Sequence, residues 1–389
     1  MRDRRLAHQL SAGVLRRQRE LDQTLELTRA DGRLHDILRL GAYQLGHLER
    51  VPAHAAVSTS VELARETAGE PAARYVNQAL RRVARDPDAG RAPASSGPAR
   101  THPDWLVERW RGRFGGATDL LLAWNDARPK LTLQPARWDL ATLQARLADA
   151  GVAVSVAPFG AGLRIVAPRP PRPSELPGYE DGAFFVQDPA QALIVRFAAV
   201  PRGAQVYDAC AAPGGKAVAL AVSGARVTAG EARRERIGRL RETVHRTGVA
   251  VRIVAADLLA PPFRAGAWDA VLVDAPCTAT GTMARHPDAR WRLTPGAIGR
   301  SARRQTALLD AAAALVRPGG LLVYATCSLE PEENEERVEE FLRGHPDFRR
   351  RPETDRVPKE LATASGDFQS LPQRDGIDGA YAARLGRSA

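Results

Sequence analysis

The sequence is poor in lysine and cysteine, and it contains no long hydrophobic run. No apolar stretch approaches the ~18 residues that a membrane-spanning helix needs, so we expect no part of the chain to cross a membrane. Residues 1–5 are charged and lead into a polar helical pattern, not into the apolar core of a signal peptide. The sequence therefore predicts a cytoplasmic protein.

Only three cysteines are present, Cys210, Cys277 and Cys327. They form no CxxC pair, and no histidine stands near them at the spacing of a metal ligand. Neither a disulfide framework nor a metal site is therefore expected. Each thiol is either a small buried side chain or a reactive group.

Lysine occurs at only three positions, and the other 53 of the 56 basic residues are arginines. A coding bias explains the preference for arginine over lysine, but it does not explain the excess of basic over acidic residues. The formal net charge is +11, and residues 1–100 alone hold 17 arginines against 12 acids. Such a surplus favours a polyanionic partner such as RNA or DNA.

The first part of the chain shows helical periodicity throughout. Apolar residues recur at spacings of three and four in residues 37–48 and 57–69, Pro52 separates the two segments, and Pro71 opens a further helix. Residues 86–100 are rich in Pro, Gly and Ser, which is typical of a linker. We predict an all-helical domain over residues 1–88 and a linker over residues 89–103.

A short mixed module follows the linker. Strand-like alternation at residues 131–134 and 162–168 surrounds a helical pattern over residues 140–151, and a second proline-rich stretch occupies residues 167–178. We predict a small α/β module over residues 104–170 and a separate domain over residues 178–389.

The last domain alternates strands and helices. Strand patterns near residues 206–208, 225–231, 251–257, 268–276 and 321–328 are interspersed with helical stretches at 232–246 and 301–316. This alternation predicts an α/β fold with a mostly parallel sheet and crossover helices on both faces. In such a fold the ligand binds at the carboxyl ends of the strands.

A turn of small residues, Cys210–Lys216, follows the strand that ends at Asp208, and a helix follows the turn. Cys210 and Ala217 stand where a phosphate-binding Walker loop needs Gly and Ser or Thr, and no GxGxxG pattern is present. The remaining candidate is a ligand that contains adenosine but no pyrophosphate. Glu231 and Asp257 end the next two strands, where they are placed to bind ribose hydroxyls and adenine, unless each acid simply caps the following helix.

Cys277 and Cys327 each follow a predicted strand, so both thiols should face the same crevice as the turn. Methylation of carbon 5 of a pyrimidine is a reaction that suits this pairing. One thiolate adds to carbon 6 and makes carbon 5 nucleophilic, and a second group then helps to release the product. Asp274, just before the first thiol, is placed to contact the cofactor or the polar edge of the base.

Three segments, residues 208–217, 273–291 and 324–336, resemble in order and spacing the signature blocks of the RsmB (Sun/Fmu) group of bacterial 16S ribosomal RNA cytosine-5 methyltransferases. Residues 371–385 resemble the final strand of that group, and the helical start resembles its NusB-like RNA-binding domain. The resemblance implies a Rossmann-like class I methyltransferase domain, the cofactor S-adenosylmethionine, and small-subunit ribosomal RNA as substrate for a monomeric enzyme. Glu231 stands where this group usually has Asp.

The resemblance also implies roles for individual residues. Cys327 would be the nucleophile and Cys277 would assist product release. The residues that it implies in cofactor binding are Cys210, Ala211, Ala212, Pro213, Gly214, Gly215, Lys216, Glu231, Asp257 and Asp274.

Two other functions stay compatible with the sequence. The same motifs permit an enzyme that methylates transfer RNA, and a non-catalytic RNA-binding assembly factor would use only the helical domain. Residues 284–292 are interpreted either as a basic wall with Arg285, Arg290 and Arg292 on phosphates or as a solvated loop. Glu332 and Asn334 are close enough in sequence to help order the Cys327 loop.

Overall fold

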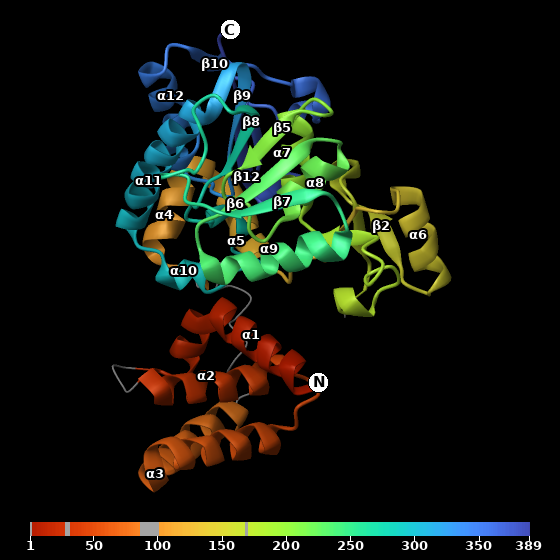
Figure 1. The fold of residues 1–389 in the computed structure, drawn as a ribbon. Helices are drawn as coiled ribbons and strands as arrows, with labels where there is room; N and C mark the ends of the chain where they lie inside the picture. Colours follow the sequence, from red (N-terminus) through yellow and green to blue (C-terminus); the bar gives the residue numbers. More distant parts are fainter. Residues whose placement is uncertain (1, 28–31, 86–100, 168–169) are drawn as a thin grey trace. The chain divides into compact units, whose positions relative to one another are not determined.

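The computed structural model describes residues 2–27, 32–85, 101–167 and 170–389 (Figure 1). The chain divides into two compact units, of which the first comprises residues 1–128 and 283–292 and the second residues 129–282 and 293–389. Of the predicted linker at residues 89–103, the part up to residue 100 lies outside the described residues. None of the described helices is long and apolar enough to span a lipid bilayer.

The first unit is helical. Gly41 allows two of its helices to pack closely, because a Cβ atom at this position would lie only 2.4 Å from Leu80 Cδ1. The third helix is broken at Gly69, whose φ of +83° favours glycine, and Pro71 opens its second half as predicted. The helices are α1 (Arg2–Thr24), α2 (Gly32–His47), α3 (Ala53–Arg85), α4 (Asp104–Phe114), α5 (Thr118–Asp126) and α10 (Ala289–Arg292).

Arg290 on α10 is fully buried within this unit. Its Nη1 donates to Asp126 Oδ1 at 2.7 Å and to the Thr101 carbonyl at 3.0 Å, and its Nη2 donates to the Asn125 carbonyl at 2.9 Å. The interpretation of Arg290 as a phosphate contact is therefore wrong, because the side chain has no exposed surface. Arg292 does remain exposed, where it pairs with Asp288 at 2.6 Å.

A four-stranded antiparallel sheet begins the second unit, in the order β2-β3-β1-β4. Asp139 precedes helix α6, and its carboxylate caps the helix by accepting from the Thr142 amide at 2.7 Å. The strand β4 follows the second proline-rich stretch in the chain and pairs with β1. The elements are β1 (Thr132–Pro135), α6 (Leu140–Asp149), β2 (Val154–Val156), β3 (Leu163–Ile165) and β4 (Phe184–Val186).

The larger sheet has the order β10-β12-β9-β8-β5-β6-β7, with β11 paired to β12. The strands from β9 to β7 are parallel, and β10, β11 and β12 are antiparallel to their neighbours, so the expected mostly parallel sheet is confirmed. Its strands are β5 (Gln205–Asp208), β6 (Arg226–Glu231), β7 (Val251–Ala255), β8 (Trp268–Asp274), β9 (Val316–Thr326), β10 (Phe348–Arg350), β11 (Phe368–Ser370) and β12 (Ala380–Arg387).

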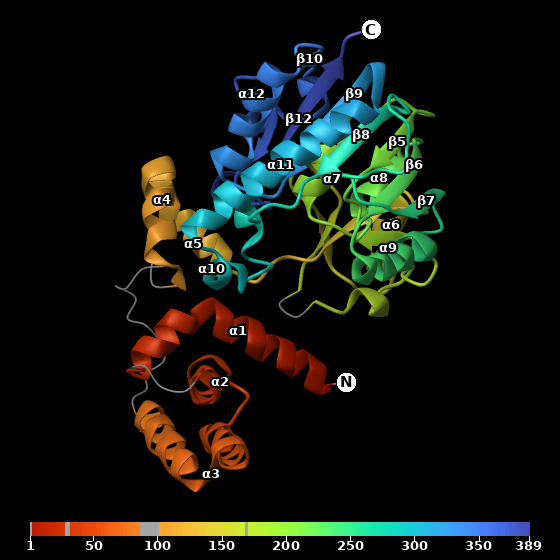
Figure 2. The ribbon, with the colours of Figure 1, turned by 60° about the vertical axis from the view of Figure 1, so that its left-hand side comes forward.

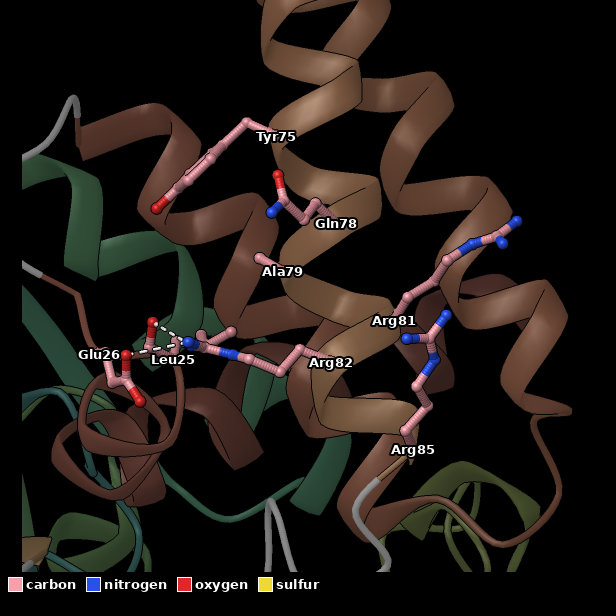
Figure 3. Close-up of a pocket in the computed structure, with 8 residues that line it drawn as sticks. All are labelled: Leu25, Glu26, Tyr75, Gln78, Ala79, Arg81, Arg82 and Arg85. Carbon is pink, nitrogen blue, oxygen red and sulfur yellow. Dashed lines mark hydrogen bonds and ion pairs between the residues drawn. The ribbon is translucent and has the colours of Figure 1, made fainter.

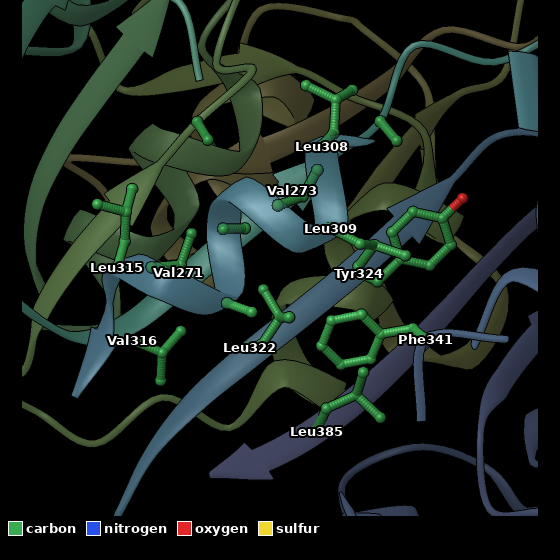
Figure 4. Close-up of a cluster of buried hydrophobic side chains, with 14 of the residues drawn as sticks. Val271, Val273, Leu308, Leu309, Leu315, Val316, Leu322, Tyr324, Phe341 and Leu385 are labelled. Carbon is green, nitrogen blue, oxygen red and sulfur yellow. The ribbon is translucent and has the colours of Figure 1, made fainter. Parts of the chain in front are cut away.

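Helices cover both faces of this sheet (Figure 2). One apolar cluster packs Leu309 of α11 and Phe341 of α12 against Tyr324 of β9 (Figure 4), and a second packs α7, α8 and α9 against the opposite face. Burial on both faces explains why these strands are almost continuously apolar. The helices are α7 (Pro189–Ala198), α8 (Gly215–Val222), α9 (Arg234–Thr247), α11 (Pro295–Leu315), α12 (Glu335–Gly344) and α13 (Pro372–Asp375).

Candidate active site

Two thiols that are 50 residues apart in sequence meet at the carboxyl edge of the large sheet. Cys277 follows β8, Cys327 follows β9, and these strands are parallel neighbours in which Asp274 pairs with Ala325. The Sγ atoms lie 3.3 Å apart in a hydrogen bond. Both cysteines are free, and the separation exceeds the ~2.05 Å of a disulfide bond. The fold thus brings the two predicted thiols into direct contact.

The surroundings of Cys277 favour its protonated form. The pKa of Cys277 is raised well above its usual value, first by its hydrogen bond with Cys327, then by burial and by the charges of Cys327 and Glu333. Cys277 is therefore the protonated thiol of the site.

Glu333 joins the loops that carry the two thiols. One carboxylate oxygen accepts from the Thr278 amide at 2.9 Å and from Gln305 Nε2 at 3.0 Å, and the other accepts from the hydroxyls of Thr278 and Ser328. The side chain is fully buried, which raises the pKa of this carboxyl group. Gln305 also donates to the Pro276 carbonyl at 3.1 Å, so this contact fixes the segment directly before Cys277.

Sequence reasoning missed Glu333 and favoured its neighbour Glu332, which is only half-buried. The acidic run around Glu333 has the pattern of a solvated helix, and nothing in it singles out one glutamate as buried. The companion prediction for Asn334 is confirmed. Its Nδ2 donates to the Ser328 carbonyl at 2.9 Å, and its Oδ1 accepts from the Thr326 hydroxyl at 2.5 Å.

A cavity of about 270 Å³ opens beside Cys277. Four of the predicted site residues line it: Cys210, Glu231, Asp257 and Cys277. Burial, followed by the charges of nearby acids, raises the pKa of Cys210 to about 12, so this thiol stays protonated. Cys210 therefore belongs to the wall of the cavity, and its chemistry differs from that of the thiol pair.

Asp208 and Glu231 do not cap the helices that follow β5 and β6, and β7 is followed by another strand, β8. Gly214 and Arg233 stand at the N-caps of α8 and α9. Glu231 Oε1 accepts from the Arg233 amide at 2.9 Å, and its Oε2 lies 3.4 Å from Arg236 Nη1 but accepts no hydrogen bond among the described residues. Asp257 Oδ1 accepts from the Leu259 amide at 3.0 Å in a local turn.

Asp208, at the end of β5, is buried in the floor of this region. Neither carboxyl oxygen has a hydrogen-bond partner within the residues that the structure describes. Burial, reinforced by the charge of Asp274, raises the pKa of Asp208 to about 7. An oriented carboxylate at Glu231 and unsatisfied buried oxygens beside a cavity fit a ligand that donates hydrogen bonds, as an adenosine does.

The turn after β5 supports the cavity wall. Gly214 has a φ of +109°, and a Cβ atom at Gly215 would lie 2.8 Å from Gln187 Nε2. Residues 211–216 do not line the cavity, although Cys210 does. Ala211, Ala212, Gly214 and Lys216 are buried, whereas Pro213 is exposed. These residues shape the turn, and only its first residue reaches the cavity.

Lys216 and Asp274 form an ion pair next to the turn. Lys216 Nζ lies 2.7 Å from Asp274 Oδ2 and also donates to Gln191 Oε1. The lysine side chain is 7% exposed and that of Asp274 is 32% exposed, so the carboxylate has an accessible side. Asp274 does not line the cavity, but it is only three residues before Cys277.

The parallel sheet with helices on both faces and a cavity at its carboxyl edge is the class I methyltransferase fold, whose cofactor is S-adenosylmethionine. Three family models match the chain. The model of the 16S rRNA methyltransferase RsmB/F family matches residues 198–386, that of the NusB family matches residues 1–85, and that of an RsmF/B-like ferredoxin-like domain matches residues 102–171.

Curated relatives match almost the whole chain. The chain is 34% identical to a probable ribosomal RNA small subunit methyltransferase B of Synechocystis sp., with 98% of this chain and 91% of the relative covered. It is 32% identical to the ribosomal RNA small subunit methyltransferase B of Vibrio cholerae, with 99% and 90% covered. The chain belongs to the 16S rRNA methyltransferase RsmB/F family.

Solved structures share the fold. The crystal structure of PH0851 matches with a TM-score of 0.82 and 25% identity, covering 98% of this chain and 89% of that one. The structure of NSun6 from Pyrococcus horikoshii with SFG matches with a TM-score of 0.64 and 20% identity, covering 74% and 98%. The second likeness supports the fold alone.

Proposed function

We propose that the protein transfers a methyl group from S-adenosylmethionine to carbon 5 of a cytosine in 16S ribosomal RNA, through a covalent bond between Cys327 and carbon 6 of the base. The observation that carries the proposal is the 3.3 Å contact between Cys277 and Cys327 at the cavity edge. Membership of the family and relatives named as small-subunit methyltransferases support the choice of substrate. Such an enzyme works in the cytoplasm, and we propose that it does so as a monomer.

In the first step Cys327 acts as the nucleophile. Its thiolate forms a bond to carbon 6, and the electron pair of the carbon 5–carbon 6 double bond moves toward carbon 5. The bound cofactor supplies an electrophilic methyl group on a positively charged sulfur. Asp274, the last residue of β8, would accept a hydrogen bond from the exocyclic amine of the base, and its ion pair with Lys216 holds the carboxylate in place.

Cys277 would act in the release step. While Cys327 is a thiolate, its negative charge and its hydrogen bond with Cys277 keep Cys277 protonated. Once Cys327 is bonded to carbon 6, that charge is gone and the pKa of Cys277 falls, so its proton passes to solvent. The Cys277 thiolate then takes the carbon 5 proton, the double bond re-forms, and the bond from carbon 6 to Cys327 breaks to regenerate the thiolate.

The residues of the cavity would hold the cofactor. Glu231 is placed to accept hydrogen bonds from the ribose hydroxyls, and Asp257 to accept from the adenine amine. Next to the cavity, which Cys210 lines, the backbone of the turn at residues 210–216 would extend the site toward the amino acid part of the cofactor, with the N-terminus of α8 directed toward its carboxylate.

Mapping of 5-methylcytosine in total RNA from cells with and without the gene tests the proposal. One cytosine in 16S ribosomal RNA should lose its methyl group without the gene and regain it when the wild-type gene is returned. Loss confined to transfer RNA would assign the enzyme a different substrate. An unchanged methylation map in both RNA classes would favour a non-catalytic assembly role.

A further inference from the structure

A groove on the first unit has charged and aromatic surface that neither the thiols nor the cofactor cavity uses (Figure 3). It encloses about 640 Å³, which is within the ~300–1,000 Å³ of sites that hold small ligands. The second half of α3 forms one wall, and Leu25 and Glu26, which follow α1, form the other.

The charges in the groove are unevenly paired. Arg82 is neutralised, because its Nη1 lies 2.9 Å from Glu26 Oε2 and its Nη2 donates to the Leu25 carbonyl at 3.2 Å. Arg81 donates only to the uncharged side chain of Asn77, at 3.0 Å, and no acid pairs with Arg81 or Arg85 within the described part of the chain. Two cationic groups are therefore available to an anion.

The side chains are also sorted by type around α3. Tyr75, Gln78 and Arg82 project on the side nearest Glu26, whereas Arg81 and Arg85 project together from the other side of the helix (Figure 3). Tyr75 is 44% exposed, which is a large open surface for an aromatic ring. An amide donor and acceptor, Gln78, stands one helical turn from that ring.

We propose that this groove binds an unpaired segment of RNA, with one base stacked on the Tyr75 ring and the neighbouring phosphates held by Arg81 and Arg85. Proteins that bind single strands combine an aromatic platform with a basic track in this way. Gln78 is placed to bond the edge of the stacked base. An acidic peptide would account for the arginines, but it would leave the exposed ring and the amide without a role. The inference rests on the proposed action on ribosomal RNA.

A cross-linking experiment with the full chain locates the contact. A ten-nucleotide single-stranded RNA that carries 5-iodouridine is irradiated with the protein, and the cross-linked peptide is sequenced by mass spectrometry. We expect the cross-link at Tyr75, and we expect its yield to fall about tenfold in the Arg81→Gln/Arg85→Gln variant. Cross-links confined to other residues would overturn the proposal.

Affinity measured by fluorescence anisotropy separates stacking from charge. Tyr75→Ala should weaken binding of the same RNA about tenfold, whereas Tyr75→Phe, which keeps the ring, should bind as wild type. The double arginine variant should lower the slope of log affinity against log salt by about 1.4, since each single-strand phosphate contact contributes ~0.7. Arg74→Gln, an exposed change on α3 outside the groove, is the matched control and should have little effect.

Methyl transfer to 16S ribosomal RNA by the same proteins keeps the two proposals apart. If the wild type methylates the RNA but Tyr75→Ala binds it with unchanged affinity, the groove proposal is wrong and the enzymatic one stands. If no methyl transfer occurs but the groove variants lose RNA binding and the Tyr75 cross-link, the enzymatic proposal fails and the groove remains an RNA site. Melting temperatures equal to the wild type establish that each variant is folded.

Discussion

The Sγ atoms of Cys277 and Cys327 form a hydrogen bond 3.3 Å long, and this contact is the first cause of the raised pKa of Cys277. A thiol that holds its proton is a poor nucleophile, so the proposed mechanism gives attack to Cys327 and the later proton transfer to Cys277. The same relationship predicts opposite phenotypes for the two single substitutions.

Cys327→Ala should abolish methyl transfer, because no other thiolate is placed to add to carbon 6. Cys277→Ala should form the bond to RNA but release it slowly, with turnover reduced by ~10²–10⁴-fold, as expected on removal of a general base. The measurement is a denaturing gel with labelled RNA, in which Cys277→Ala should give a protein–RNA band. The Cys277→Ala/Cys327→Ala double variant is the control and should give none. Full methyl transfer by Cys327→Ala would refute the assignment.

Glu333→Gln should lower kcat by about 10–100-fold with little change in KM for RNA. Glutamine keeps one acceptor oxygen, but its amide nitrogen cannot accept the hydrogen bonds that the second carboxylate oxygen now accepts, so the link between the loops of Cys277 and Cys327 weakens. The rate of iodoacetamide labelling at Cys327 reports the disturbance of the thiol pair directly. Glu332→Gln, one residue away and half-exposed, is the matched control. Equal labelling rates in the two variants would contradict this role.

Glu231→Ala should weaken the binding of S-adenosylmethionine by about 10–100-fold, which is the usual cost of losing hydrogen bonds to a charged group. Isothermal titration calorimetry in the absence of RNA measures this effect separately from catalysis. Glu235→Ala, an exposed change in the first turn of α9, removes the same charge outside the cavity. If both variants bind the cofactor equally well, Glu231 does not contact the ribose.

The contribution of Asp208 to the free energy of unfolding should fall as the pH rises from about 4 to about 7. The Asp208 pKa is about 7 in the folded state against 3.8 for an exposed aspartate, so over this pH range the folded protein holds a proton that the unfolded chain has released. The resulting stabilisation is complete below the lower pKa and is lost as the pH rises through the upper one. Asp208→Asn removes this titration.

Melting curves at pH 5 and pH 8 test the linkage. The fall in melting temperature between these values should be smaller in Asp208→Asn than in the wild type by roughly 5–10 °C. Asp269→Asn is the control, because a hydrogen bond from the Gln205 amide lowers the pKa of Asp269 and its titration lies outside this interval. Parallel behaviour of wild type and Asp208→Asn would show that the raised pKa is absent.

Local sequence patterns were sufficient to predict much of the fold. The strands at residues 206–208 and 268–276 are apolar runs bounded by turn residues, and the structure places β5 and β8 there. Their parallel order places residues that follow strand ends at one edge, so the meeting of Cys277 with Cys327 could be expected from sequence alone. The predicted domain boundaries and the roles of the site residues stay predictions.

Two buried charges could not be predicted, because their environment is built by distant segments. Arg290 lies in a charged stretch that has the pattern of a surface loop, yet Asp126, 164 residues earlier, pairs with it in the interior. Glu333 becomes buried because Thr278 and Gln305 from other elements close around it. Charge patterns along a chain carry no information about partners of this kind.

The parallel register of β8 and β9 also limits how the gene can change. A single-residue insertion or deletion in either strand would shift the thiol that follows it by ~3.3 Å and would reverse which side chains face each helix layer. The loops between the two strands that lie outside α10 and α11 are free of this restriction, since their length does not determine where either strand ends. Related genes can therefore differ in the number of codons in these loops, while the strand lengths before each thiol remain constant.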